Sequence, residues 1–85
     1  MKENNLKESL VSFLTEFFPD LESKLDDLEA VNFYTDYGLD SITFVTMVIR
    51  IEEAFNIIIP TEHIVMENFV TFNKIQALIN RCMNE

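Results

Sequence analysis

The sequence predicts an all-α fold, a bundle of three main helices and one short helix with a long loop after the first helix. Apolar residues recur at three- and four-residue steps in three separate stretches, which is the spacing of one helical face. The short apolar run within residues 56–60, closed by a proline, has no second run with which to pair as a sheet. We therefore expect helices packed on helices.

The first main helix is marked by apolar residues from Leu6 to Phe18 and ends before Pro19. Residues 19–40 form the longest connection. Leu21, Leu25 and Leu28 allow a short helix there, but the surrounding acids favour a long loop packed over the core. Connections of this length are uncommon in small domains and are often functional.

The second main helix should run from about Ser41 to Phe55. Residues 56–60 then read as a buried connection closed by a proline. Residues 61–66 predict the short helix, with Thr61 as its N-cap. The last main helix should start near Thr71 and place its apolar residues on one face.

Length and composition limit the function. The 85 residues allow a single domain over residues 1–85, and 48% hydrophobic residues supply its core. One cysteine rules out an intramolecular disulfide, and Cys82 with the single His63 cannot form an ordinary zinc site, so no metal is expected. The paired acids Asp26 and Asp27 lack the ligand pattern of a calcium loop.

The net charge of −9 argues against a nucleic-acid partner and favours docking onto basic protein surfaces. The alternative for any one acid is an ordinary solvated loop. Residues 16–40 nevertheless carry eight acids against one base, Lys24; the acids are Glu16, Asp20, Glu22, Asp26, Asp27, Glu29, Asp36 and Asp40.

The polar start of the chain does not resemble a signal peptide, and no stretch is apolar enough to span a bilayer. We expect a cytoplasmic monomer that does not insert into membranes. Because the chain runs from Met1 to Glu85 without linkers, we also expect a free-standing protein.

The second helix has two apolar faces. Its core face carries Phe44, Met47, Val48, Ile51 and Phe55. The opposite face, where polar residues are expected, carries Ile42, Val45 and Ile49, with Thr46 and Glu53 at its edge. Exposed apolar groups with a polar rim often mark a partner surface. The alternative is that the long loop, or a second copy of the chain, covers this face.

Gly38 is the only glycine where average usage would give about six, which suggests a positive φ or a close backbone approach. Three residues later, Asp40 and Ser41 open the second helix, where either residue is a typical N-cap. A nucleophilic Ser41 would need a base and an oxyanion loop that the sequence lacks, so we do not expect an enzyme. A phosphate on the serine suits the positive end of a helix.

The run Asp36-Tyr37-Gly38-Leu39-Asp40-Ser41-Ile42 resembles the phosphopantetheine attachment motif of acyl carrier and peptidyl carrier proteins. The likeness extends over about residues 5–83, through Phe33, the end of the second helix, Ile59-Pro60 and Thr71-Phe72. It implies an acyl-carrier-like four-helix bundle.

By this resemblance, Ser41 carries 4′-phosphopantetheine, derived from coenzyme A, as a phosphodiester, and the arm holds acyl or aminoacyl groups as thioesters. The partners implied are a phosphopantetheinyl transferase, a loading enzyme and downstream synthases. The recognition positions implied are Asp36, Asp40, Ile42, Val45, Thr46, Ile49 and Glu53.

The sequence departs from fatty-acid carriers where Thr43, Thr46 and Arg50 replace or oppose the usual acids. This favours a specialised pathway, such as polyketide or non-ribosomal peptide synthesis, over a fatty-acid or D-alanyl carrier. The alternative of another class is a small acidic adaptor without a prosthetic group, in which Ser41 only caps the helix.

Overall fold

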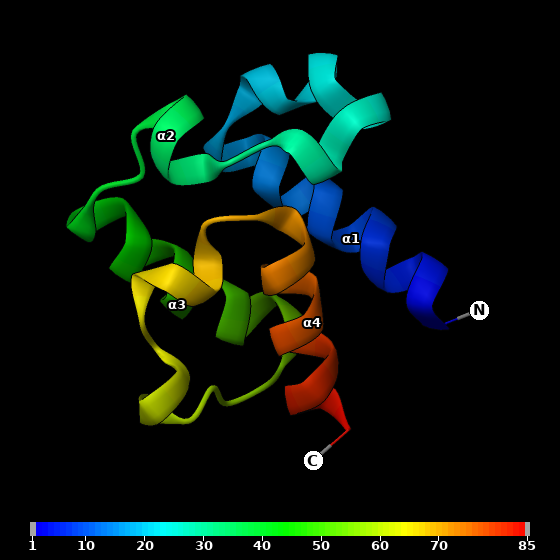
Figure 1. The fold of residues 1–85 in the computed structure, drawn as a ribbon. Helices are drawn as coiled ribbons and strands as arrows, with labels where there is room; N and C mark the ends of the chain where they lie inside the picture. Colours follow the sequence, from blue (N-terminus) through cyan, green and yellow to red (C-terminus); the bar gives the residue numbers. More distant parts are fainter. Residues whose placement is uncertain (1, 85) are drawn as a thin grey trace.

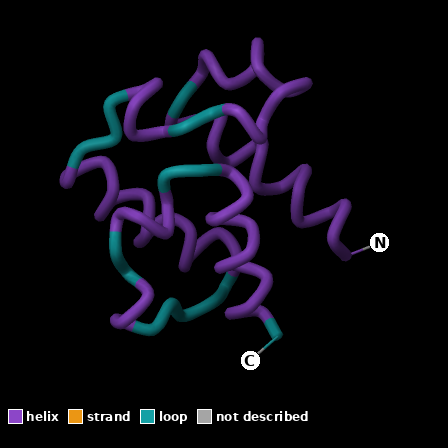
Figure 2. The backbone as a smooth tube through the Cα atoms, viewed as in Figure 1, coloured by secondary structure: helices purple, strands orange, loops and turns teal. Residues whose placement is uncertain are grey.

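The computed structural model describes residues 2–84 and is built from helices joined by short connections (Figure 1). No strand occurs in these residues (Figure 2), so the all-α prediction is confirmed for the described part of the chain. In chain order the elements are α1 Lys2–Phe17, the 3₁₀ segment η1 Pro19–Ala30, α2 Phe33–Tyr37, α3 Ser41–Phe55, the 3₁₀ turns η2 Thr61–His63 and η3 Met66–Phe69, and α4 Phe72–Met83.

Helix α1 buries its predicted apolar face and ends where the sequence predicts. Leu10 and Leu14 are fully buried. Phe18, the residue before Pro19, leaves the helical region with φ −133° and ψ 80°, as the proline ring requires. Its N–H still donates to the carbonyl of Leu14 at 2.8 Å, which closes the last turn.

The connection between the first and second main helices is not the predicted loop. Most of it is helical, as η1 and α2. Segment η1 is interrupted at Lys24 and Asp27, whose backbone angles are not helical. Leu21 and Leu28 are buried while Leu25 is 44% exposed. Two buried leucines seven residues apart anchor single turns of helix but do not provide the continuous apolar stripe of a stable α-helix.

The predicted short helix at residues 61–66 is instead part of two 3₁₀ turns, η2 and η3. The prediction of Thr61 as N-cap is wrong, because Pro60 holds that position and its side chain cannot accept a hydrogen bond. The side-chain amide of Asn68 donates to the carbonyl of His63 at 2.9 Å and ties the two turns together.

The connection at residues 56–60 is buried only in part. Ile59 is 3% exposed, whereas Ile58 is 85% exposed. Asn56 ends α3 in the left-handed region, with φ 54°. The N–H of Ile59 donates to Oε2 of Glu52 at 2.9 Å, so this connection is fastened to the end of α3.

One apolar cluster draws residues from α1, η1, α2, α3, η3 and α4. Phe33, Phe69 and Phe72, from three different elements, are 2% exposed or less. The N–H of Phe33 donates to the carbonyl of Val70 at 2.7 Å, next to an isolated antiparallel bridge between Asn32 and Thr71. The start of α2 is thereby fixed to the start of α4, and this holds the segment that leads to Ser41.

Candidate functional site

Ser41 is exposed and is the first residue of α3. The N-cap is Asp40, whose Oδ1 accepts from the N–H of Thr43 at 2.7 Å. The carbonyl of Asp40 accepts from the N–H of Phe44 at 2.8 Å and starts the helical ladder. Of the two candidate caps, the structure therefore assigns the role to Asp40, and the Ser41 hydroxyl is not needed to start the helix.

The turn before Ser41 depends on Gly38, which ends α2 with φ 66° and ψ 42°. Its N–H donates to the carbonyl of Tyr34 at 3.1 Å, and the next N–H, of Leu39, donates to the carbonyl of Phe33 at 3.0 Å. Apart from Gly38 itself and its two chain neighbours, no heavy atom of the described residues lies within 4 Å of where a Cβ would stand on Gly38. The positive φ is thus confirmed as the reason for glycine, and close backbone approach is excluded.

Leu39 is 2% exposed, while Asp40 and Ser41 on either side of the helix start are exposed. The left-handed turn therefore places one apolar side chain in the core and presents the next two residues at the surface. The sequence analysis did not single out Leu39, although an apolar residue between Gly38 and Asp40 indicates that this position is buried in the core.

Asp36, a predicted recognition residue, also closes the start of α2. Its Oδ2 accepts from the N–H of Asn32 at 2.9 Å. In return, Oδ1 of Asn32 accepts from the N–H groups of Tyr34 and Thr35, each at 2.9 Å. This reciprocal arrangement resembles a capping box. Asp36 is exposed, so its carboxylate stabilises the helix and still faces solvent.

The outward face of α3 consists of Ile42, Val45 and Ile49, which are 80%, 52% and 51% exposed. Thr46 and Glu53 at its edge are exposed as well. On the opposite face Met47, Val48 and Ile51 are buried. The two-faced character of the helix is confirmed, and in the described chain residues 19–40 do not cover the outward face.

Helix α3 has few charged residues, and two of them, Arg50 and Glu52, interact with other parts of the chain. Glu52 turns toward the connection after the helix, where it accepts from Ile59. Arg50 lies 4.0 Å from Oε1 of Glu16, and its guanidinium lies 6.0 Å from the ring centre of Phe17. Arg50 therefore adds a positive charge beside the outward face and links α3 to the end of α1.

The hydrogen bond from the N–H of Thr43 lowers the pKa of the Asp40 carboxyl below its usual value. The positive end of α3 therefore already interacts with a carboxylate next to Ser41.

In α2, the hydroxyl of Tyr37 is buried without a hydrogen-bond partner among the described residues. Burial, followed by the charges of Asp20 and Asp36, raises the pKa of Tyr37.

A sequence model of the phosphopantetheine attachment site family matches residues 15–81, most of the chain. The chain belongs to this family. It is therefore an acyl-carrier-like domain that carries covalently attached 4′-phosphopantetheine and is not itself an enzyme. Carrier domains of this family work with a phosphopantetheinyl transferase and with loading and synthase enzymes. No curated protein and no solved structure gives a significant match.

The residues present fit this prosthetic group. The matched range includes the exposed Ser41 hydroxyl at the tip of α3, which has no part in capping the helix.

Across residues 2–84, no helix is long and apolar enough to cross a membrane. In the same residues, no cluster of three His, Cys, Asp or Glu side chains could hold a metal ion.

Proposed function

We propose that Oγ of Ser41 is the atom to which the carrier domain attaches phosphopantetheine. The observation that supports this most is that Asp40, and not Ser41, caps α3, so that the Ser41 hydroxyl stays exposed. A modifying enzyme can reach such a hydroxyl without unwinding the helix. The Gly38 turn keeps the hydroxyl at the surface because Leu39 is anchored in the core.

The surface around Ser41 is the proposed recognition site for partner enzymes. Ile42, Val45 and Ile49 supply apolar area that a partner can bury, and each such side chain contributes about 1.5–3 kcal/mol when fully buried. Thr46 and Glu53 supply its polar edge. Asp36 and Asp40 flank the serine with negative charge and suit a basic residue or bound metal of the transferase.

The attached arm supplies a terminal thiol, which holds acyl or aminoacyl groups as thioesters. The chain itself positions the attachment atom and presents a docking face beside it. We propose that it delivers these groups among the enzymes of a specialised pathway, such as polyketide or non-ribosomal peptide synthesis.

The charge of α3 supports this choice of pathway class over a fatty-acid or D-alanyl carrier. Glu52 is engaged with Ile59, and Arg50 brings a positive charge next to the outward face. A largely apolar face with little net charge suits partners whose docking surfaces are less basic than those that bind a strongly acidic helix. We further propose that residues 1–85 act as one domain, as a monomer in the cytoplasm.

The test uses the purified apo protein, coenzyme A, magnesium and a broad-specificity phosphopantetheinyl transferase, followed by intact-mass measurement. We expect the wild-type chain to gain the mass of one phosphopantetheine. Ser41→Ala should gain nothing, whereas Ser12→Ala, a change at another exposed serine, should react like the wild type. Circular dichroism checks that both variants are folded.

A Ser41→Ala chain that still gains the group would show that another residue is the attachment site. Incubating the modified protein with a panel of acyl- and aminoacyl-loading enzymes then tests the pathway class. Loading by enzymes of fatty-acid synthesis alone would contradict the specialised role.

A further inference from the structure

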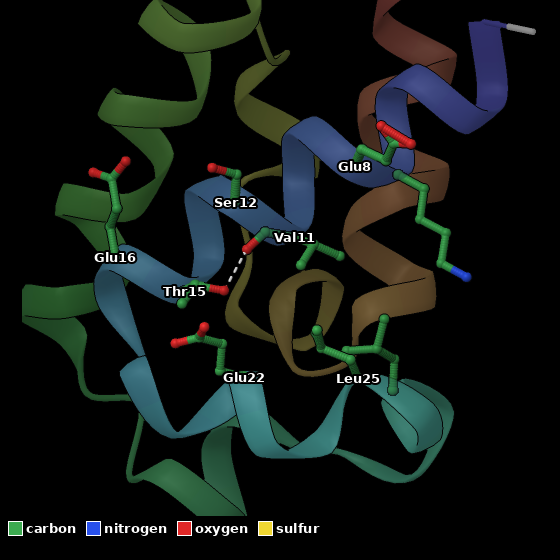
Figure 3. Close-up of a pocket in the computed structure, with 9 residues that line it drawn as sticks. Glu8, Val11, Ser12, Thr15, Glu16, Glu22 and Leu25 are labelled. Atoms are coloured by element: carbon green, nitrogen blue, oxygen red, sulfur yellow. Dashed lines mark hydrogen bonds between the residues drawn. The ribbon is translucent and has the colours of Figure 1, made fainter.

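A groove of about 760 Å³ lies between α1 and η1 (Figure 3). Val11 on α1 and Leu25 on η1 point toward one another across it. The buried Leu28 also lines it. Leu25 is 44% exposed, although Leu21 and Leu28 on the same segment are buried. The exposed part of Leu25 therefore gives up the free energy that burial of apolar area would provide. The groove therefore offers apolar area that the chain's own fold does not cover.

The rim of the groove is acidic. Glu8 and Glu16 on α1 and Glu22 on η1 line it, against the single base Lys7. The whole of η1 carries five acids and one base, so the field around the groove is negative. Glu16 also lies 4.0 Å from Arg50, which leaves Glu8 and Glu22 as the acids for which no ion pair is found among the described residues.

This groove is separate from the proposed attachment site. In Figure 1 the green start of α3 lies at the left edge of the molecule, beyond α2, whereas the cyan η1 lies at the top and the blue α1 runs to the right. None of the recognition residues proposed for α3 lines the groove. A molecule bound there would leave the Ser41 hydroxyl accessible.

The groove suits a helix better than a small molecule. It is open to solvent, whereas small ligands are usually enclosed over most of their surface. Its lining on α1 extends from Lys7 to Glu16, nine residues apart, which at 1.5 Å per residue corresponds to about 14 Å, or between two and three helical turns.

We propose that the α1–η1 groove is a second docking surface, and that its partner is an amphipathic helix of another protein with basic flanks. Apolar residues of that helix would insert between Val11 and Leu25. Its Lys or Arg residues would face Glu8 and Glu22 on the two sides of the groove. The surface would let one protein hold the carrier while a second works at the tip of α3.

The proposal is tested on the unmodified 85-residue chain, so it does not depend on the attachment at Ser41. The probe is a synthetic helical peptide with leucines at i, i+3, i+4 and i+7 and lysines elsewhere. A second peptide with glutamate in place of lysine is the control. Backbone chemical shifts of the isotope-labelled protein report where the peptide binds, and their titration gives Kd.

We expect shifts in α1 and η1 with the lysine peptide and none with the glutamate peptide. Leu25→Ser should raise Kd about tenfold or more, because it removes apolar area at the centre of the groove. Val65→Ser is the matched control, since Val65 is similarly exposed at 46% but lies outside α1, η1 and α3; it should change Kd by less than about twofold.

Glu22→Gln, compared with Glu62→Gln at an exposed position in η2, tests the charge in the same way and stands in if Leu25→Ser does not fold. Shifts confined to α3, equal effects of the paired variants, or no binding of the lysine peptide would overturn the proposal. None of these results would affect the proposed role of Ser41.

Discussion

At the scale of single residues, Gly38 shows how a backbone angle determines what the surface presents. With φ 66° and open space around the Cβ position, a side chain here meets a conformational penalty and no clash. Gly38→Val should therefore lower the free energy of unfolding by about 1–2 kcal/mol. Gly38→Asn, which tolerates the left-handed region better, should cost less.

Chemical denaturation of both variants measures these costs. Equal stability of wild type and Gly38→Val would show that the positive φ at position 38 does not penalise other residues. We also expect both variants, once folded, to remain substrates for the transferase, because the substitution adds no contact at Ser41.

Asp40 gives a pH-dependent prediction. Because its pKa in the folded protein lies below the usual 3.8, its capping contribution is complete above that value and is lost as the pH falls through the lower folded pKa. Asp40→Asn keeps a capping oxygen that does not titrate. The difference in Tm between wild type and Asp40→Asn should be constant near neutral pH and should move in favour of the variant as the pH falls below 3.8.

Thermal melts across this pH range test the prediction. A difference that stays flat down to the lowest pH would mean that the hydrogen bond to Thr43 does not bias the titration of Asp40.

At the scale of elements, α3 separates a buried face from an outward face that we assign to partners. Ile42→Ser should leave Tm nearly unchanged, because Ile42 is 80% exposed. It should lower kcat/KM of the transferase about tenfold or more, the loss expected when a central apolar contact of an interface is removed.

Ile58→Ser is the matched control, since Ile58 is 85% exposed but lies outside α3. It should leave kcat/KM within about twofold of wild type. Equal effects of the two substitutions would argue that exposed apolar residues act nonspecifically and that α3 has no special role in recognition.

The elements also show what the sequence could and could not predict. Helices with a continuous apolar stripe, such as α1, α3 and α4, were predictable from residue spacing because packing decides their position. The helical turns of η1 were missed because only Leu21 and Leu28 hold them to the core. The N-cap of η2 does not follow from the threonine at position 61, because the turn begins one residue earlier and Pro60 occupies the cap position.

The candidate site, too, could be predicted from the sequence only in part. The outward position of Ile42, Val45 and Ile49 follows from helical spacing alone. That Asp40 and not Ser41 caps α3 depends on hydrogen-bond geometry, because both side chains are suited to the position. The groove between α1 and η1 depends on two segments meeting in space, so no local pattern could indicate it.

At the scale of the whole molecule, stability depends on one aromatic-rich core. Phe69, in the 3₁₀ turn η3, is fully buried and packs edge-on against Phe44 of α3 at 5.2 Å between ring centres. Phe69→Ala should lower the free energy of unfolding by about 3–5 kcal/mol. This is a large share of the total expected for a domain of this size.

Urea denaturation measures the loss, and Val65→Ala in the preceding connection, at a half-exposed position, is the control. A cost for Phe69→Ala below about 1 kcal/mol would show that Phe69 and its contact with Phe44 contribute little to the stability of the core.

The Ser41 hydroxyl is the proposed attachment point of the prosthetic group. The most direct measurement is fragmentation mass spectrometry of the modified wild-type protein, which locates the added phosphopantetheine within the chain. We expect fragments that place it on Ser41 and nowhere else. Fragments that place it on any other residue would show that Ser41 is not the attachment site.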